Sequence, residues 1–199
     1  MFGNSSIAFS AGYQVPPGHS SALPGIQTRY LYSLVAVSDQ AILHSLEHRH
    51  LQAWPRCRVP YLLTAAIAES LAMCPYLSYY QGPSVEVGIS TKTLMYHDRR
   101  LLGAFIRLIA LYLYRHTLKE GRIRISNQVY RGRAEVVFGG RDTYLQAGSL
   151  MPDTALSVMV DATDIAHIQD FLHTRTMGYL HIDDSDTGIV SIKLVLPDC

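Results

Sequence analysis

The chain has 199 residues, of which 48% are hydrophobic and 17% are charged. This length and composition predict one globular domain with a short extension, and enough apolar side chains for a packed core. The 17 Lys and Arg residues almost balance the 16 Asp and Glu residues, which leaves a net charge of +1. That balance argues against a nucleic-acid-binding protein, because such proteins are normally strongly basic. It also favours self-association, since copies repel one another weakly.

The cysteines and the longest apolar stretches indicate a cytoplasmic protein. Cys57, Cys74 and Cys199 are widely spaced and form no Cys-x-x-Cys pair, so neither a zinc ribbon nor a disulfide framework is expected. No stretch reaches the roughly 18 uninterrupted apolar residues of a membrane-spanning helix. Residues 1–21 have neither the basic start nor the apolar core of a signal peptide. We therefore expect a reducing compartment and no membrane contact.

The N-terminal part of the chain divides into two segments. Residues 1–27 are rich in Ser, Gly and Pro, which predicts a flexible arm. Residues 28–55 carry apolar side chains at helical spacing, which predicts one long amphipathic helix. Its apolar stripe has to pack either on the domain that follows or on a second copy. We expect this helix to make the dimer or partner contact.

Residues 56–199 read as one α+β domain. The predicted elements are a helix at 60–73, a strand at 84–90, a short strand near 93–96, a long helix opened by Asp98 and ended by residues 119–121, strands at 122–130 and 134–139 joined by a turn at 131–132, an irregular stretch at 140–160, a helix from Asp161, and strands at 179–183 and 189–196. This order predicts a two-layer α/β sandwich with helices on one face of a mixed sheet. The inward-facing residues are expected to be Ile123, Ile125, Val129, Ile192, Leu194 and Leu196.

Two stretches resemble the ATP-binding domain of sensor histidine kinases. In residues 98–125, an Asp opens a long helix and an Arg-Ile-Arg-Ile strand follows. In residues 165–197, a helix precedes Met177-Gly178-Tyr-Leu-His-Ile182 and a closing strand that ends Lys-Leu-Val-Leu-Pro197. The resemblance runs from Arg58 to Pro197 and implies the GHKL-type ATPase fold, also called the Bergerat fold, preceded by one long helix.

Three nucleotide-contact elements of that family are replaced in this sequence. The Asn that holds magnesium and phosphates is expected near Leu111 or Tyr112, which lack the hard oxygen ligands that Mg²⁺ needs. The Asp that accepts from the adenine amine is expected at Phe138 or Gly139. The glycine-rich segment near the phosphates corresponds to residues 157–163, which contain no glycine. We therefore expect no nucleotide, no metal and no other cofactor.

The resemblance leaves two interpretations of this site open. With a shifted register, Asp142 takes the adenine-binding role and the chain is a residual ATPase. Without it, the side chains of Leu111, Tyr112 and Phe138 fill the former cleft and turn it into core or docking surface.

The histidines of the N-terminal helix suggest two kinds of chemistry. His44-Ser-Leu-Glu-His48 satisfies the His-x-x-Glu-His pattern of the inverted zinc peptidases, with both imidazoles on one helix face. No further acidic cluster supplies a third ligand, so no metal site is predicted. His48-Arg49 resembles the His-Arg of a phospho-accepting box in one histidine kinase subgroup, although the Lys-Asn that should follow is absent. His48 is thus the candidate phospho-acceptor, because an imidazole nitrogen can attack an acyl phosphate. A plain polar helix face is the remaining interpretation, and the other histidines, His97, His116, His167, His173 and His181, fit surface or boundary positions.

The sequence therefore favours a non-catalytic pseudo-ATPase, or pseudokinase. We expect it to act in signal transduction by protein–protein interaction, within a two-component-type pathway. A response regulator or a kinase is the expected partner, and the chain is expected to form a homodimer. The alternative is a histidine phosphotransferase that relays phosphoryl groups through His48.

Overall fold

The computed structural model describes residues 39, 41–46, 56–74, 77, 82–89, 92–147, 160–175, 178–185 and 187–197. The predictions for residues 1–27, and for most of residues 28–55, lie outside this part of the chain.

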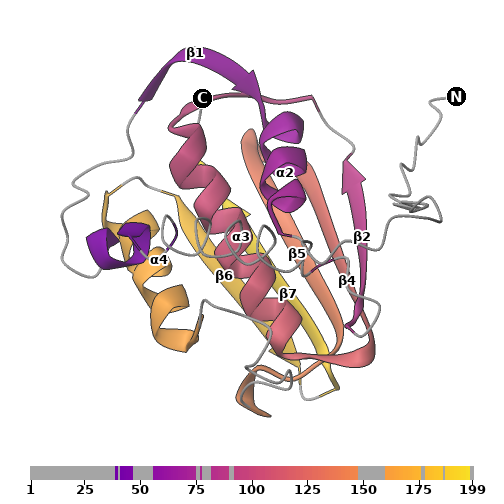
Figure 1. Ribbon diagram of the computed structural model, residues 1–199. Coiled ribbons are helices and arrows are strands. Elements are labelled where there is room, and N and C mark those ends of the chain that lie inside the picture. Colours follow the sequence, from indigo (N-terminus) through magenta and orange to yellow (C-terminus); the bar gives the residue numbers. More distant parts are fainter. Residues whose placement is uncertain are drawn as a thin grey trace, which may run out of the picture.

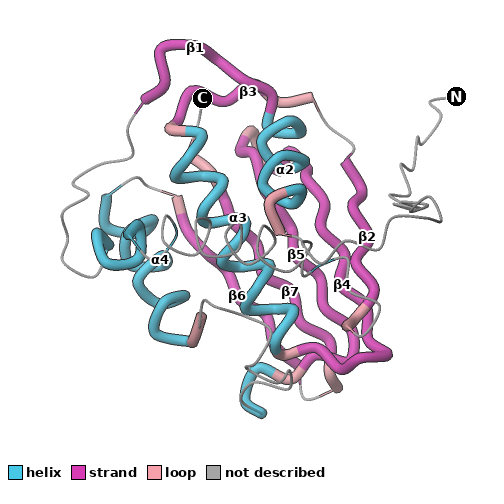
Figure 2. The backbone as a smooth tube through the Cα atoms, viewed as in Figure 1, coloured by secondary structure: helices cyan, strands magenta, loops and turns pink. Residues whose placement is uncertain are grey.

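The described elements form two layers (Figure 1). They are β1 (Arg56–Leu62), α2 (Leu63–Ala72), β2 (Ser84–Ile89), β3 (Leu94–His97), α3 (Arg99–Arg115), β4 (Thr117–Tyr130), β5 (Arg133–Thr143), the 3-10 turn η2 (Leu145–Ala147), α4 (Ala162–Arg175), β6 (Tyr179–Ser185) and β7 (Ile189–Val195). Five strands form a sheet in the order β2-β4-β5-β7-β6, in which only the β2–β4 pair is parallel. Helices α2, α3 and α4 cover one face of this sheet, as Figure 2 shows. The predicted α+β sandwich is confirmed.

Helix α3 is the centre of the helical layer. Asp98 begins it, because its carboxylate accepts hydrogen bonds from the backbone N–H groups of Arg100 at 2.8 Å and Leu101 at 3.0 Å. The side chains from Leu101 to Arg115 are all buried, so the prediction of a helix enclosed on most of its circumference is confirmed.

The predicted end of α3 at residues 119–121 is wrong. The helix ends at Arg115, and β4 already begins at Thr117. The buried Thr117 hydroxyl donates to the carbonyl oxygen of Leu113 at 2.7 Å, and it lies 2.8 Å from the hydroxyl of Thr143 on β5. These bonds connect the turn to α3 and to β5. Strand β4 therefore begins before the stretch in which buried and exposed side chains alternate.

The predicted helix at 60–73 begins three residues late in the structure, and an unpredicted strand precedes it. Residues 56–62 form β1, which pairs antiparallel with β3 as a separate two-stranded sheet. Pro60 was interpreted as the start of the helix, but it lies inside β1, where an edge strand tolerates its missing N–H. The strand depends on a partner about 35 residues away, which local spacing does not reveal.

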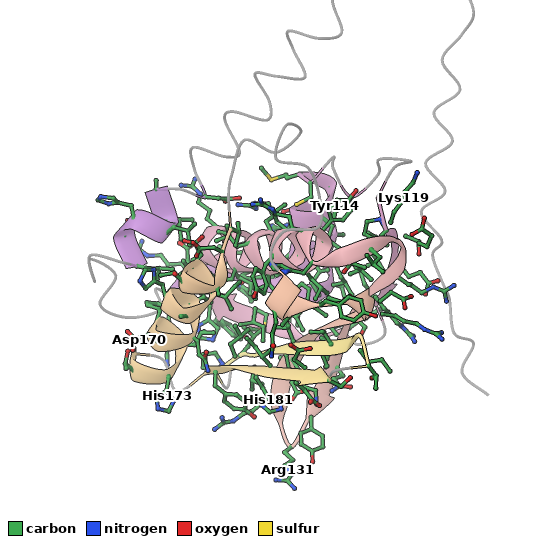
Figure 3. The ribbon with its side chains drawn as sticks, turned by 90° about the horizontal axis from the view of Figure 1, so that it is seen from below. Tyr114, Lys119, Arg131, Asp170, His173 and His181 are labelled. Carbon is green, nitrogen blue, oxygen red and sulfur yellow. The ribbon has the colours of Figure 1, made fainter. Side chains whose placement is uncertain are left out.

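The β4–β5 hairpin confirms the predicted turn. Arg131 and Gly132 have φ angles of +51° and +80°, as a two-residue type I′ turn requires. Ile123 and Ile125 are buried as predicted, but Val129 is 50% exposed, close to the end of the hairpin at Arg131, which projects away from the helices (Figure 3). Strand β5 also continues to Thr143, so residues 140–143 are not irregular as predicted.

The C-terminal strands agree more closely with the prediction. The side chains of Ile192, Leu194 and Leu196 are fully buried in the core. None of the helices in the described ranges is long and apolar enough to cross a membrane.

Part of the predicted N-terminal helix packs on the domain behind it. Residues 41–46 are helical, and Leu43 and Leu46 join the main hydrophobic core. Asp39, just before them, makes a bidentate ion pair with Arg107 of α3, with bonds of 2.5 Å and 3.0 Å. For this stretch, the first of the two packing partners left open by the sequence is the one observed.

Candidate functional site

The C-terminal half of α3 forms the wall where a metal-bound nucleotide would be expected. Leu111 and Tyr112, the two positions at which an Asn was sought, are each only 5% exposed. Magnesium takes carboxylate, carbonyl, phosphate and water oxygens, none of which an aliphatic side chain or a neutral phenol supplies. This wall is therefore apolar and aromatic where the chemistry of a nucleotide site needs a hard ligand.

Tyr112 packs against a second aromatic group at the end of α3. Its ring centroid lies 4.6 Å from that of His116, four residues further along the chain and directly after the end of α3. The carbonyl oxygen of His116 accepts from the backbone N–H of Tyr144 at 2.8 Å, and His116 Nδ1 lies 3.3 Å from the carbonyl oxygen of Tyr144. The end of α3 is thus fixed to the segment that follows β5.

Burial favours the uncharged form of both groups. Burial raises the pKa of Tyr112, and the carboxylates of Asp184 and Asp161 raise it further. Burial lowers the pKa of His116, with the neighbouring Arg115 acting in the same direction. The hydrogen bond to the Tyr144 backbone and the charge of Asp184 oppose this lowering of the His116 pKa. The pair presents no charge that would attract a phosphate.

Strand β5 places neither of its candidate positions at a strand end. Phe138 is fully buried and pairs with Ile125 on one side and Ile192 on the other. Gly139 likewise continues the regular pairing with both neighbouring strands. An adenine-accepting carboxylate is expected where a strand opens into a loop, whereas these two residues lie within the ladder. The Phe138 ring contributes to the core beneath α3.

Asp142 is the acidic residue nearest to the end of β5. It is half-buried, and its backbone has a φ of +58°, one residue before the strand ends at Thr143. A positive φ at a non-glycine residue is uncommon, although Asp tolerates it better than most residues. The adenine-binding role considered for Asp142 stays a prediction.

The N-terminus of α4 is already occupied by a carboxylate of the chain itself. The side chain of Asp161 accepts from the backbone N–H groups of Thr163 at 2.7 Å and Asp164 at 3.0 Å, and the Asp164 carboxylate accepts from the N–H of Asp161 at 2.9 Å. Unbonded N–H groups at a helix N-terminus are what bind phosphates. Here the N–H groups of Thr163 and Asp164 are bonded, and the carboxylates of Asp161, Asp164 and Asp184 place negative charge near the start of α4 and near Tyr112.

No metal cluster is found in the described residues. They contain no group of three or more His, Cys, Asp and Glu side chains arranged to hold a metal ion. His44 is exposed on the helical segment 41–46. His48 lies outside the described residues, so the pairing of the two imidazoles and the role of His48 as phospho-acceptor stay predictions.

Two of the remaining histidines differ from their predicted surface or boundary positions. His97 and His116 are buried, at 6% and 7% exposure. His97 ends strand β3, and burial and the charge of Arg56 lower its pKa, although a hydrogen bond with the Pro197 backbone opposes them. The exposed positions of His173 and His181 agree with the prediction (Figure 3). An alternating or helical pattern shows on which face of a strand or helix a histidine lies, but it does not show whether other elements cover that face.

Comparison with known proteins identifies the fold. No protein-family model and no curated protein matches the sequence. Among solved structures, the cytoplasmic segment of the histidine kinase QseC matches with a TM-score of 0.57, over 83% of this chain and 95% of that chain. The fold is that of a histidine kinase ATPase domain. The sequence identity to QseC is 7%, so this match speaks for the fold alone.

Two further histidine kinase structures agree. The Acinetobacter baumannii histidine kinase AdeS matches with a TM-score of 0.54 and 17% identity, over 86% of this chain and 81% of that chain. Histidine kinase ThkA, in complex with the response regulator protein TrrA, matches with a TM-score of 0.55 and 11% identity, over 94% of this chain and 54% of that chain. The expectation of a histidine kinase ATPase fold from residues 58–197 is therefore confirmed.

Sequence reasoning missed the arrangement of acidic groups around Tyr112 and the start of α4. The spacing of Asp161 and Asp164 predicted the start of a helix. The same spacing also allows the carboxylate of each residue to accept a hydrogen bond from the backbone N–H of the other, and this reciprocal capping was not predicted. Asp184 gave no local signal, since it approaches Tyr112 from a strand more than 70 residues away.

Proposed function

We propose that this chain is a non-catalytic signalling or regulatory protein that works by binding other proteins. The observation that carries the proposal is the wall formed by α3, in which the buried side chains of Leu111 and Tyr112 take the place of a metal-binding Asn. A histidine kinase fold without that ligand retains a scaffold but loses the group that would hold Mg²⁺ and the triphosphate.

Two other features of the site support the same conclusion. The ring of Phe138, one of the two positions at which the resemblance implies an adenine-binding carboxylate, is buried in the core beneath α3. Asp161 occupies the N–H groups at the start of α4 that would otherwise face phosphates. A nucleotide would have to displace an intramolecular carboxylate and overcome the repulsion of the nearby acidic groups.

A partner from a two-component-type pathway fits this interpretation. One structure with the same fold, that of ThkA, was determined in complex with a response regulator protein. We propose a response regulator or a kinase as the partner of this chain, and a homodimer as its assembly. Residues 56–199 would form the histidine-kinase-ATPase-like domain, with residues 1–27 as a flexible arm and residues 28–55 as the helix for dimer or partner contact.

Titration calorimetry of the full chain with Mg-ATP tests the loss of the nucleotide site. The proposal predicts no saturable heat up to millimolar nucleotide, while an active histidine kinase ATPase domain measured alongside shows binding. Saturable micromolar binding by this chain would contradict the proposal. In that case, its loss in Asp142→Asn would favour the residual ATPase.

A histidine phosphotransferase is the second candidate, because His44 is exposed on its helical segment and His48 follows at the spacing that shares a helix face. Incubation with a receiver domain carrying a labelled aspartyl phosphate separates the two functions. Transfer of label that disappears in His48→Ala and persists in the matched control His44→Ala would establish this candidate. An unlabelled wild-type chain would eliminate it.

A further inference from the structure

The face of the five-stranded sheet that points away from the helices carries three exposed arginines. Arg122 and Arg124 alternate along β4 with the buried Ile123 and Ile125, so their side chains lie on the opposite face from the helical layer. Arg141 of β5 is also exposed on that face. We call Arg122, Arg124 and Arg141 the arginine cluster. Figure 3 views the two layers from the side and shows His181 and Arg131 on this same side of the sheet.

The strand register makes this cluster unfavourable for the fold itself. Arg122 and Arg141 are directly opposite each other across the β4–β5 pair, where like charges destabilise a sheet. The ion pair given by the structure for Arg122 is with Glu86, at 3.5 Å, and both side chains are more than half exposed. Such an exposed pair offsets little of the repulsion. The position of the arginines is therefore better explained by an external anionic group than by the stability of the isolated chain.

The neighbouring residues leave the cluster accessible. The guanidinium of Arg124 lies beside Gly88 of β2, with its nitrogens 3.6 Å and 3.7 Å from where a Cβ would stand. Ile189 of β7, opposite Arg141, is 59% exposed and adds an apolar contact area next to the charges. Cationic and apolar groups side by side are typical of protein interfaces, in which Arg is enriched.

We propose that the arginine cluster is a docking surface for an acidic protein surface. Arginine presents a planar fork of N–H donors that matches a carboxylate in bidentate fashion. A nucleic acid fits less well, because the net charge of the chain is only +1, whereas nucleic-acid-binding domains are normally strongly basic. This inference names the partner chemistry of the proposed function and rests on it for the idea that the chain acts by binding.

Fluorescence anisotropy with a labelled oligoglutamate peptide tests the surface at low ionic strength. Wild-type full-length chain should bind the peptide, and added salt should weaken the binding. The variant Arg122→Glu/Arg124→Glu should lose at least tenfold in affinity. The matched control Lys92→Glu/Arg100→Glu, which makes the same charge change at exposed residues outside the cluster, should retain the wild-type affinity.

Each other outcome would overturn the inference. Equal losses in both variants would mean that the peptide senses net charge alone. Failure of the wild type to bind the peptide would exclude the surface, whether or not it binds a single-stranded DNA of equal charge or vesicles of phosphatidylcholine and phosphatidylserine. The single variant Arg141→Glu adds an independent check, because it replaces a like-charge pair by an opposite pair. It should weaken peptide binding without lowering the melting temperature, whereas a merely structural role would give a lower one.

These outcomes are separable from those of the proposed function. Mg-ATP binding would refute the loss of the nucleotide site without affecting the peptide result. Unchanged peptide binding in the cluster variants would refute the docking surface while leaving the nucleotide result intact.

Discussion

Replacing Asp39 by alanine should strongly destabilise the fold. Asp39 makes both bonds of a bidentate pair with Arg107, at 2.5 Å and 3.0 Å, and the two side chains are only 6% and 10% exposed. The substitution leaves a cation inside the helical layer without its carboxylate partner. Breaking a buried ion pair in this way costs about 3–5 kcal/mol. That is a large part of the total stability of roughly 5–15 kcal/mol of a typical domain.

The expected change is large enough to measure by two methods. In a chain of this size, each kcal/mol shifts the melting temperature by about 2–4 °C, so Asp39→Ala should lower it by about 6–20 °C. Urea denaturation followed by circular dichroism gives the free energy of unfolding by linear extrapolation, and an unchanged slope would show that the variant exposes the same surface on unfolding.

Two further variants decide whether the buried pair is the cause. Asp39→Ala/Arg107→Met removes both buried charges and should recover most of the loss. Glu69→Ala removes the partner of Arg99 in an exposed ion pair, and should cost less than about 1 kcal/mol. If Asp39→Ala cost no more than Glu69→Ala, the docking of the N-terminal segment on α3 would be refuted.

Three other perturbations have defined outcomes. Gly82→Ala should cost about 1–3 kcal/mol in a thermal melt, since its Cβ would stand 1.7 Å from the hydroxyl oxygen of Tyr114, and an unchanged melting temperature would refute this packing. Thr117→Val should lower the free energy of unfolding in urea by about 1–3 kcal/mol, because it leaves the buried hydroxyl of Thr143 without its partner. The double variant Thr117→Val/Thr143→Val should cost less, because it removes that hydroxyl as well. The folded-state pKa of His116 is lowered below 6.5, so the unfolded chain binds more protons and the free energy of unfolding should fall as the pH drops below about 6.5. His116→Gln should flatten this pH dependence. An identical dependence of stability on pH in the variant and the wild type would exclude the buried neutral imidazole.

The sequence predicted the parts of the fold that depend on local periodicity. The alternation of Ile123 and Ile125, the cap at Asp98 and the Arg131-Gly132 turn each carry their structural cause within a few residues. Strand β1 did not, because it exists only through its pairing with β3, about 35 residues away. Val129 was misplaced for a related reason, since alternation shows the two faces of a strand but not where the covering helices end.

The candidate site was predictable as a set of replacements but not as a geometry. The apolar character of Leu111, Tyr112 and Phe138 could be read directly from the chain, and their burial follows from the packing of α3 on the sheet. The approach of Asp184 to Tyr112 could not be predicted, because it depends on how the end of β6 meets α3. The ion pair between Arg107 and Asp39 could not be predicted either, because it forms only when the N-terminal segment packs on α3.

The backbone amides of Thr163 and Asp164, followed by NMR during a titration with Mg-ATP, show directly whether the chain has lost the nucleotide site. In the structure, both N–H groups donate to the Asp161 carboxylate at the start of α4. If the nucleotide site is lost, these two resonances, and those around Tyr112, should stay in place up to millimolar nucleotide. Saturable shifts confined to these amides would show that the chain still binds a triphosphate where histidine kinases do, and would contradict the central claim.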